Sequence, residues 1–396
     1  MDQIRNIMIV AGEASGDGHA AKLVTAIREA EKATEFRFFG AAGPRMREAG
    51  VEAVIESDHL SVVGLAEIGK ALPMFLRVKR RLMAAAADTK PDVVVLVDFP
   101  DFNLKLAKSL KKQGRTIIYY ISPQLWAWRK YRISTIKKYV DLLIAILPFE
   151  KEWYSKNGVE HVEYVGSPLA REVFSTKTRR EFCADHELDP SRTVISLLPG
   201  SRHKEIVRIL PVMLGAAVEI LKAVPDAQFV VALANEHQRQ DIDSCVKSFE
   251  RSYDHLPVLK IVAEETYNAL NASDAAAITS GTATLEAGII GTPMVIVYKT
   301  SRMNYSLLEP LISVDHYGLI NLIAGESIAK ELIQDDFTSD TLATEILGLL
   351  SPERGAEIRA RLKDAVDKLG HGGASKRAAA LIIAMTQRER AINSPA

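Results

Sequence analysis

The sequence predicts an α/β protein built from two Rossmann-like, doubly wound domains. Short β-branched runs alternate with segments of helical periodicity along the 396 residues, which is typical of parallel sheets joined by crossover helices. The alternation starts again after the turn-rich junction Val165–Pro168. Because 47% of the side chains are hydrophobic, the chain is apolar enough to form two cores. We therefore expect one domain over residues 1–168 and a second over residues 169–355.

The expected strands are short and apolar. In the first domain they lie near residues 7–11, 36–39, 93–97, 116–121 and 142–147, and in the second near 194–198, 229–233, 259–262, 275–278 and 294–297. Residues 356–396 are polar and helix-forming, so we expect them to pack back on the first domain. Doubly wound sheets bind ligands outside the carboxyl ends of their strands. We therefore look for the site in the loops after these strands, facing a cleft between the two domains.

Composition excludes several classes of protein. Fifty basic and fifty acidic residues cancel, so nothing at whole-chain level predicts nucleic-acid binding. No run approaches the roughly 20 apolar residues that span a bilayer, and the first apolar run, 7–11, leads directly into a turn, unlike a signal segment. Cys183 and Cys245 lie far apart, outside metal-ligand spacing. These features predict a cytosolic protein with reduced cysteines and no metal site.

The first candidate loop is Ala11–His19, which follows the first expected strand and opens a helix. Its glycines allow a ligand to approach the backbone closely, and Ser15 and Asp17 are residue types that cap helices. The spacing departs from GxGxxG. Two interpretations therefore stay open, a plain strand-helix turn and a substrate-facing loop.

The second candidate loop is Asp98–Asn103, which follows a fully apolar strand. Asp98 would lie at the mouth of the cleft, and we consider it the leading candidate for a general base. Asp101 is expected to cap the following helix. The alternative for either carboxylate is that it only binds backbone amides.

The third candidate loop is Ser122–Arg129, which places Trp126, Trp128 and Arg129 after another strand. Two indoles so close in sequence do not easily share one core face. The segment is either a loop packed on the domain surface or an apolar and cationic wall for an acylated or sugar substrate.

Two loops of the second domain are suited to anions. In the first, Gly200, Ser201 and Arg202 lie where a diphosphate would bind, unless Arg202 only pairs with Glu205. In the second, the residues Ser280, Gly281 and Thr282 precede a helix and are expected to present free amide groups at its N-terminus.

The segment Leu60–Met83 breaks the alternation of strands and helices. Apolar residues at helical spacing are interleaved with basic ones, and Glu67 is the only acid between residues 65 and 83. The basic bias favours a surface that lies on anionic lipid over an ordinary amphipathic core helix. The residues expected to face the membrane are Leu65, Ile68, Leu72, Phe75, Leu76, Arg77 and Arg80.

Ordered blocks along most of the chain resemble the lipid-A-disaccharide synthase family. These blocks are GEASGD at 12–17, AAGPRM at 41–46, PDFN at 100–103, SPQLWAWR at 122–129, LPFEKEWY at 147–154, LLPGSR at 197–202, SGTATLEAGIIGTPMVIVYK at 280–299 and NLIAG at 321–325. The resemblance implies a GT-B glycosyltransferase fold with an N-terminal acceptor domain and a C-terminal donor domain. It implies no required metal or other cofactor.

The resemblance also implies the partners. The donor would be UDP-2,3-diacylglucosamine and the acceptor 2,3-diacylglucosamine 1-phosphate, joined by a β-1,6 linkage with inversion and release of UDP. The enzyme would associate peripherally with the cytoplasmic face of the inner membrane. Whether the chain forms a homodimer, and whether its C-terminal helices then swap between two chains, stays open.

The roles of single residues follow from the same resemblance. Asp98 and Arg202 match functionally important family positions, with His19 as a rival base. On the donor side, Glu286 matches a position that holds ribose hydroxyls by analogy with GT-B enzymes. Asn321 would approach UDP, although Ile320 stands where the family usually has proline. The acceptor-side candidates are Glu13, Ser15, Gly16, Asp17, Gln124, Trp126 and Arg129.

Two other functions stay open at this stage. One is a different GT-B enzyme acting on a soluble sugar, against which the basic segment 60–83 and the tryptophan pair speak. The other is a module that binds lipid or nucleotide without turnover.

Overall fold

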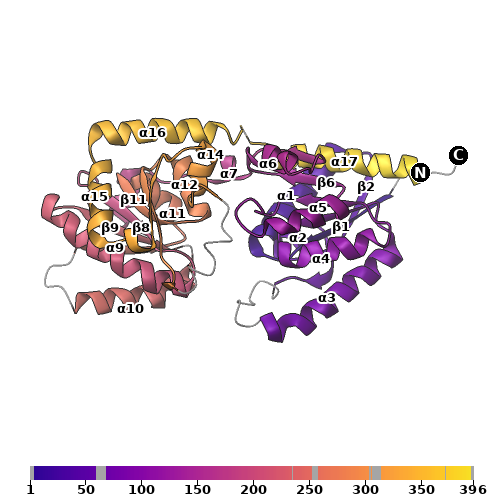
Figure 1. Ribbon diagram of the computed structural model, residues 1–396, viewed down its shortest axis with the longest axis horizontal. Coiled ribbons are helices and arrows are strands. Elements are labelled where there is room, and N and C mark those ends of the chain that lie inside the picture. The colour runs from indigo at the N-terminus through magenta and orange to yellow at the C-terminus, as the bar shows by residue number, and fades with distance from the viewer. Residues whose placement is uncertain are drawn as a thin grey trace. The chain divides into compact units, whose positions relative to one another are not determined.

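The computed structural model describes residues 4–58, 68–233, 235–251, 257–302, 305, 314–370 and 372–393. The chain divides into two compact units (Figure 1). Unit 1 contains Met1–Pro168 and Gly372–Ala396, and unit 2 contains Leu169–His371. Each unit has one parallel sheet with helices on both faces, which confirms the predicted α/β fold of two doubly wound domains.

The sheet of unit 1 has seven parallel strands in the order β3-β2-β1-β4-β5-β6-β7. The strands are β1 (Ile4–Ala11), β2 (Glu35–Ala42), β3 (Glu52–Glu56), β4 (Val93–Val97), β5 (Ile117–Tyr120), β6 (Leu142–Ala145) and β7 (Val162–Tyr164). Sequence analysis missed β3 and β7. Both are edge strands, and edge strands are short and carry charged residues, which removes the apolar signal.

Each face of this sheet is covered by helices. One face packs against α1 and α17, and the other against α3 and α4. The helices of unit 1 are α1 (Ala14–Ala30), α2 (Pro44–Glu48), α3 (Ile68–Thr89), α4 (Pro100–Lys111), η2 (Lys130–Arg132), α5 (Ile133–Tyr139), α6 (Glu150–Lys156) and α17 (Ala374–Asn393).

The sheet of unit 2 has six parallel strands in the order β10-β9-β8-β11-β12-β13. They are β8 (Val194–Leu198), β9 (Gln228–Leu233), β10 (Val258–Ala263), β11 (Ala275–Thr279), β12 (Met294–Tyr298) and β13 (Lys330–Ile333). The strand that sequence analysis missed, β13, is again an edge strand.

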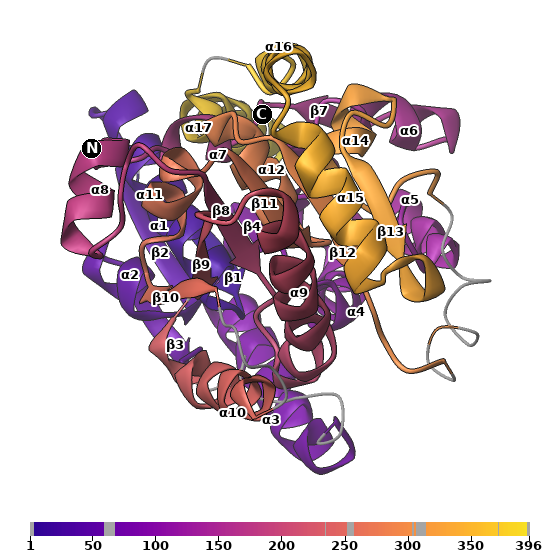
Figure 2. The same cartoon turned by 90° about the vertical axis from the view of Figure 1, so that its left-hand side faces the viewer.

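The helices of unit 2 surround this sheet, with α9 and α15 packed side by side (Figure 2). They are α7 (Leu169–Glu172), α8 (Arg179–Asp185), α9 (His203–Ala223), η3 (Glu236–Gln238), α10 (Arg239–Glu250), α11 (Thr266–Ala272), α12 (Thr282–Ile290), α14 (Leu319–Ala324), η5 (Gln334–Asp336), α15 (Ser339–Leu349) and α16 (Pro352–Asp367).

The C-terminal return to unit 1 starts later than the expected residue 356, which lies inside α16. This helix packs against α12 and α14 of unit 2, so it belongs to the second unit. Only α17 returns to pack on α1, where Ala378 and Ile382 enter the core of unit 1. The Arg377 Nε donates a hydrogen bond to the Val165 carbonyl at 2.7 Å and anchors the start of this helix.

Strand order reverses once in each sheet. The reversal lies between β1 and β4 in unit 1 and between β8 and β11 in unit 2. At such a switch point the connections on either side run to opposite faces, which leaves a crevice outside the carboxyl ends of the two strands. The loops after these four strands are therefore the candidate binding sites.

Candidate active-site loops

The loop after β4 places Asp98 at the switch point of unit 1. Asp98 is half-buried and lies one residue beyond the strand. Burial, and to a smaller extent the negative charge of Glu13, raise the pKa of Asp98 to about 6. A hydrogen bond from the Phe99 amide acts in the opposite direction and only partly offsets this rise. A carboxylate with this pKa is ionised at neutral pH and still accepts a proton readily, which suits a general base.

The loop after β1 contacts the Asp98 loop directly. A Cβ atom on Gly12 would lie inside the ring of Phe99, so the lack of a side chain at Gly12 allows the two turns to pack. Glu13 and Ser15 are exposed, and His19 is half-buried on α1. These side chains stay candidates for contact with a substrate, and His19 stays a rival base.

Asp17 has a structural role that the expected acceptor-side contact did not anticipate. Its carboxylate accepts hydrogen bonds from the amides of Arg45 at 2.9 Å and Met46 at 3.1 Å. The side chain is buried and caps the N-terminus of α2. The expected contact of Asp17 with an acceptor is therefore wrong for its carboxylate, whereas Gly16, which is buried in the first turn of α1, stays an acceptor-side candidate.

The two tryptophans of the loop after β5 have different surroundings. Trp126 is only 4% exposed, whereas Trp128 is 42% exposed. The Trp126 indole donates to Glu150 Oε1 at 3.0 Å and packs edge-on against Phe149. Trp126 is therefore a core residue, and the expectation that it lines a substrate wall is wrong. Trp128 and the exposed Gln124 are the residues of this loop that face solvent.

Arg129 is held by two neighbours within unit 1. Its guanidinium lies 4.0 Å from the centre of the Trp128 ring and bonds Asp101 Oδ1 at 2.7 Å. Asp101 also pairs with Arg132, and its side chain does not cap α4 as expected. The arginines hold the pKa of Asp101 below its ordinary value, although burial acts in the opposite direction.

Glu150, which was not among the residues predicted from sequence, links this loop by hydrogen bonds to the segment that follows β6. Its Oε2 accepts hydrogen bonds from the amides of Ile146 at 3.2 Å and Leu147 at 3.0 Å, while its Oε1 accepts from Trp126. Burial raises the pKa of Glu150 to about 7 despite these donors. Glu150 is the first residue of α6 and lies several residues beyond the end of β6, so its position in the sequence carried no signal of this role beyond the family resemblance of its block.

In unit 2, the loop after β8 is closed by Glu205. The Glu205 Oε2 accepts from the amides of Ser201 at 3.1 Å and Arg202 at 3.3 Å, and Oε1 pairs with Arg202 Nη1 at 2.7 Å. Gly200 has φ +107°, and a Cβ there would lie 2.6 Å from Glu205. The open alternative of an Arg202–Glu205 pair is therefore present. Because Arg202 is 80% exposed, the pair is a weak one that an anionic ligand can displace.

In the loop after β11, Ser280 is hydrogen-bonded within unit 2, whereas the next two residues are exposed. The Ser280 amide donates to the Val297 carbonyl at 2.9 Å, and its hydroxyl donates to the Tyr317 carbonyl at 2.6 Å. The expectation that Ser280 presents a free amide is therefore wrong. Gly281 and Thr282 are exposed at the N-terminus of α12, where helix geometry leaves amides without intrahelical partners. An anion site here is expected to use these later amides.

Glu286 lies half-buried on the second turn of α12. The Tyr267 hydroxyl donates to its Oε1 at 3.1 Å. Burial raises the pKa of Glu286, and burial and the Glu286 charge raise the pKa of Tyr267. The Tyr267 hydroxyl thus holds the carboxylate in place on the helix whose N-terminus is the expected anion site.

Asn321 is a structural residue, so the expected contact of its side chain with UDP is wrong in this geometry. The side chain is fully buried. Its Nδ2 donates to the Ala329 carbonyl and to Glu331 Oε1, both at 2.8 Å. Its Oδ1 accepts from the amides of Ile328 at 3.0 Å and Ala329 at 2.9 Å. Every donor and acceptor of the amide is therefore used within unit 2.

The expected membrane-facing helix, α3, is exposed at its start. Leu72 is 53% exposed and Leu76 is 48% exposed, and Arg77 and Arg80 are exposed beside them. Leu65 lies outside the described residues, and Ile68 is described only as the first residue of α3.

Phe75 differs from these residues because it packs inward. Its ring lies 6.2 Å from that of Phe99 and 5.9 Å from that of Phe102. Phe75 therefore ties α3 to the loop that carries Asp98 and is not a lipid-facing side chain. Within the described part of the chain, no helix is long and apolar enough to cross a membrane.

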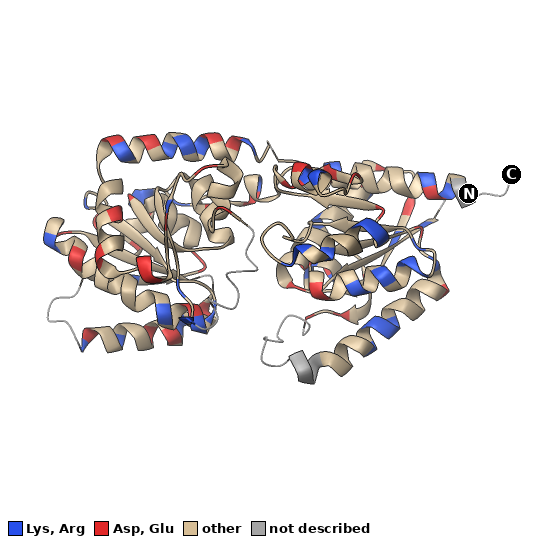
Figure 3. Cartoon of the chain, in the orientation of Figure 1, with Lys and Arg blue, Asp and Glu red and all other residues tan. Residues whose placement is uncertain are grey.

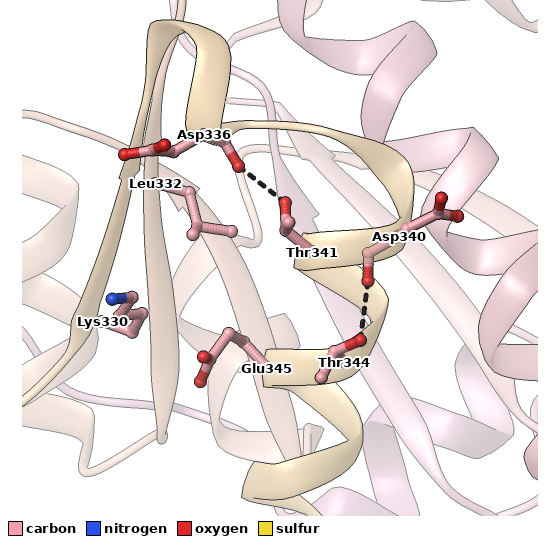
Figure 4. A pocket seen from close by; sticks show the side chains of 7 residues that line it. All are labelled: Lys330, Leu332, Asp336, Asp340, Thr341, Thr344 and Glu345. Carbon is pink, nitrogen blue, oxygen red and sulfur yellow. Dashed lines mark hydrogen bonds between the residues drawn. The ribbon is translucent and has the colours of Figure 1, made fainter.

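A separate hollow of about 420 Å³ lies between the edge strand β13 and α15 (Figure 4). Two threonine hydroxyls in it already bond within the chain, Thr341 to the Asp336 carbonyl at 2.6 Å and Thr344 to the Asp340 carbonyl at 2.8 Å. It includes none of the site residues predicted from sequence. Among the described residues, no group of three His, Cys, Asp or Glu side chains is placed to hold a metal ion.

Comparison with known proteins identifies the family of the chain. The family model for lipid-A-disaccharide synthetase matches residues 7–384. The lipid-A-disaccharide synthase of Trichlorobacter lovleyi is 41% identical over 385 residues, which cover 97% of this chain and 98% of that one. The enzyme of the same name from Syntrophus aciditrophicus is 42% identical over 96% of this chain and 98% of its own.

Among solved structures, a putative UDP-N-acetylglucosamine 2-epimerase from Listeria monocytogenes aligns with a TM-score of 0.66 at 15% identity, covering 97% of both chains. The likeness to this epimerase supports the fold alone, because the sequence identity is low. The family follows from the sequence matches over nearly the full length. The chain belongs to the lipid-A-disaccharide synthase family of glycosyltransferases.

Proposed function

We propose that this enzyme transfers the sugar of UDP-2,3-diacylglucosamine to 2,3-diacylglucosamine 1-phosphate. The products are the β-1,6-linked disaccharide 1-phosphate and UDP. Membership of the family supports this pair of substrates. The observation that carries the chemistry is the half-buried Asp98 at the switch point of unit 1, with its pKa raised to about 6. A proton acceptor is what an attacking hydroxyl requires.

The reaction is a single displacement with inversion. The acceptor 6-hydroxyl attacks C1 of the donor sugar while Asp98 accepts its proton, and the bond from C1 to the UDP oxygen breaks. Negative charge gathers on the departing diphosphate. Arg202 and the amides of Gly281 and Thr282 stabilise this charge more in the transition state than in the substrate. His19 is the alternative base, and Glu286 holds the ribose hydroxyls.

The acylated substrates reach the enzyme at a lipid surface. The exposed leucines in the first half of α3 enter the interface. Lys and Arg residues lie along α3 and α4 (Figure 3), and these cations contact the anionic headgroups. Burial and the positive charges of Lys105, Lys108 and Lys112 lower the pKa of Lys79, which indicates that lysines of the two helices share one surface. This surface lies on the cytoplasmic face of the inner membrane.

Product analysis tests the reaction. The purified enzyme is incubated with the acylated UDP-sugar alone and then with the acylated sugar 1-phosphate added, and products are identified by mass spectrometry. We expect UDP and disaccharide 1-phosphate in equal amounts, and only when both substrates are present. UDP release without acceptor would point to a hydrolase or epimerase, and no release at all to a binding module.

Vesicle sedimentation tests the lipid surface. Replacing Leu72 and Leu76 with serine removes apolar contact area, so we expect the fraction bound to phosphatidylglycerol vesicles to fall at least fivefold while UDP binding is unchanged. Phe75 is left in place because it packs against Phe99 and Phe102. Sedimentation equal to that of the unaltered enzyme would contradict this orientation.

A further inference from the structure

The backbone at the proposed base is strained. Asp98 has φ +47° and Phe99 has φ +50°, so two consecutive residues with side chains adopt the left-handed region. Single non-glycine residues rarely do so, and such conformations persist only where the surrounding structure holds them. The neighbours of Asp98 therefore have to supply the constraint.

Two buried side chains donate hydrogen bonds to the Asp98 carbonyl oxygen. The Tyr119 hydroxyl, from the third residue of the neighbouring strand β5, donates a hydrogen bond to it at 2.6 Å. The Asn103 Nδ2 donates to the same oxygen at 2.8 Å and to the Val97 carbonyl at 3.2 Å. Both side chains are fully buried, so solvent does not compete for these bonds.

A third contact acts on the next residue. The Phe99 ring occupies the space that a side chain at Gly12 would fill, and it also packs against Phe75 and Phe102. The Asp98–Phe99 pair is thus fixed from β5, from α4 and from the turn after β1. The carboxylate of Asp98 projects from a backbone that has little freedom to relax.

We propose that Tyr119, with Asn103 as its partner, is a positioning residue for proton transfer. It holds the Asp98 backbone in the left-handed conformation that keeps the carboxylate half-buried and near Glu13. Tyr119 does not touch the substrate. Burial and the charge of Asp98 keep the Tyr119 pKa well above its ordinary value, so the hydroxyl remains a donor throughout the working pH range. This inference rests on the proposed role of Asp98.

The decisive variant is Tyr119→Phe, which removes the hydroxyl and keeps the ring. We expect kcat to fall about tenfold. The acid limb of the kcat/KM profile should move from near pH 6 to at least one unit lower, because a relaxed carboxylate becomes solvated and its pKa returns toward the ordinary value of 3.8. The KM for the donor should change less than twofold.

Tyr154→Phe is the matched control. Tyr154 is also a fully buried tyrosine of unit 1, and its hydroxyl donates to a backbone carbonyl, that of Pro123, at 2.5 Å. Loss of this bond should lower stability without moving the acid limb. An acid limb for Tyr119→Phe that coincides with those of Tyr154→Phe and the unaltered enzyme would overturn the proposal.

A measurement without turnover separates this proposal from the proposed function. The Asp98 pKa is read by carbon-13 NMR of aspartate-labelled enzyme, with the resonance assigned by its absence in Asp98→Asn. A lower Asp98 pKa in Tyr119→Phe, or in Asn103→Leu if the first variant does not fold, supports positioning. An unchanged pKa rejects it even if Asp98→Asn is inactive, whereas an active Asp98→Asn rejects the role of Asp98 itself.

Discussion

The switch-point loops of the two units hold their key charged residue in opposite ways. Asp98 in unit 1 is half-buried on a strained backbone, with its pKa raised to about 6. Arg202 in unit 2 is 80% exposed and pairs with Glu205 of its own loop. A base needs a tuned proton affinity, which burial provides, whereas a group that binds diphosphate needs only a permanent charge that can reach the ligand. Under the proposed function, the same strand-loop-helix unit therefore serves two chemical tasks.

The largest expected effect is the loss of the proposed base, Asp98. Asp98→Asn keeps the size of the side chain but removes its proton affinity, so we expect kcat to fall by about 10² to 10⁴ while the protein stays folded. Transfer is measured with labelled donor. For the unaltered enzyme, kcat/KM should rise with pH through about 6 and then level off, since only ionised Asp98 accepts a proton.

His19→Gln provides the comparison that separates the two candidate bases. If His19 is the base, its variant loses the larger part of kcat, and Asp98→Asn retains near-normal turnover. That outcome would assign the role of general base to His19 instead of Asp98.

Sequence predicted those parts of the fold that depend on buried periodic residues. The five apolar strands expected in each half are present. Most of them are central, buried strands that consist of continuous apolar runs, and β10 is an edge strand that is apolar enough to be predicted. The edge strands β3, β7 and β13 were missed because their pattern is interrupted by charge. The location of the candidate loops followed from the rule that ligands bind at carboxyl strand ends, before any side-chain geometry was known.

Side-chain roles were harder to predict, because they depend on partners distant in sequence. Asp17 bonds amides at 45 and 46, and Trp126 bonds Glu150. No local pattern distinguishes such residues from ligand contacts. In the sequence, Tyr119 has the pattern of any other residue of a buried strand. Only the fold shows that its hydroxyl donates a hydrogen bond to the Asp98 carbonyl.

Asn321→Ala tests whether Asn321 stabilises the fold of unit 2 through its internal hydrogen bonds or contacts UDP. The change leaves the amides of Ile328 and Ala329 without their buried acceptor. We expect the free energy of unfolding, measured with urea, to fall by about 2–4 kcal/mol. An unchanged unfolding free energy with a raised KM for the donor would restore Asn321 as a contact with UDP.

Arg202→Ala should behave in the opposite way. Because the side chain is 80% exposed, we expect the unfolding free energy to change by less than about 0.5 kcal/mol. The kcat/KM should fall about 10- to 100-fold, with partial recovery in Arg202→Lys, which restores charge but not bidentate geometry. A variant that is destabilised yet fully active would show that the Glu205 pair is the main role of Arg202.

The smallest expected effect is a pair of stability changes of opposite sign within one loop. The raised pKa of Asp98 means that its charged form is disfavoured by folding, so its contribution to stability is complete below about pH 4 and is lost as pH rises through about 6. Asp98→Asn should therefore be more stable than the unaltered enzyme at pH 8, by about 1–2 kcal/mol after allowance for solvent screening. The difference should vanish near pH 4.

Asp101→Asn is the control for this pair, since Arg132 and Arg129 hold the pKa of Asp101 below its ordinary value. Its charged form is favoured by folding, so its contribution is present above about pH 4 and is lost as pH falls. Urea titrations at about pH 3 and at pH 8 should show that Asp98→Asn gains stability and Asp101→Asn loses stability, relative to the unaltered enzyme, at the higher pH. If both variants shift in the same direction, the burial of Asp98 does not control its proton affinity, and the contrast between the two switch-point loops fails.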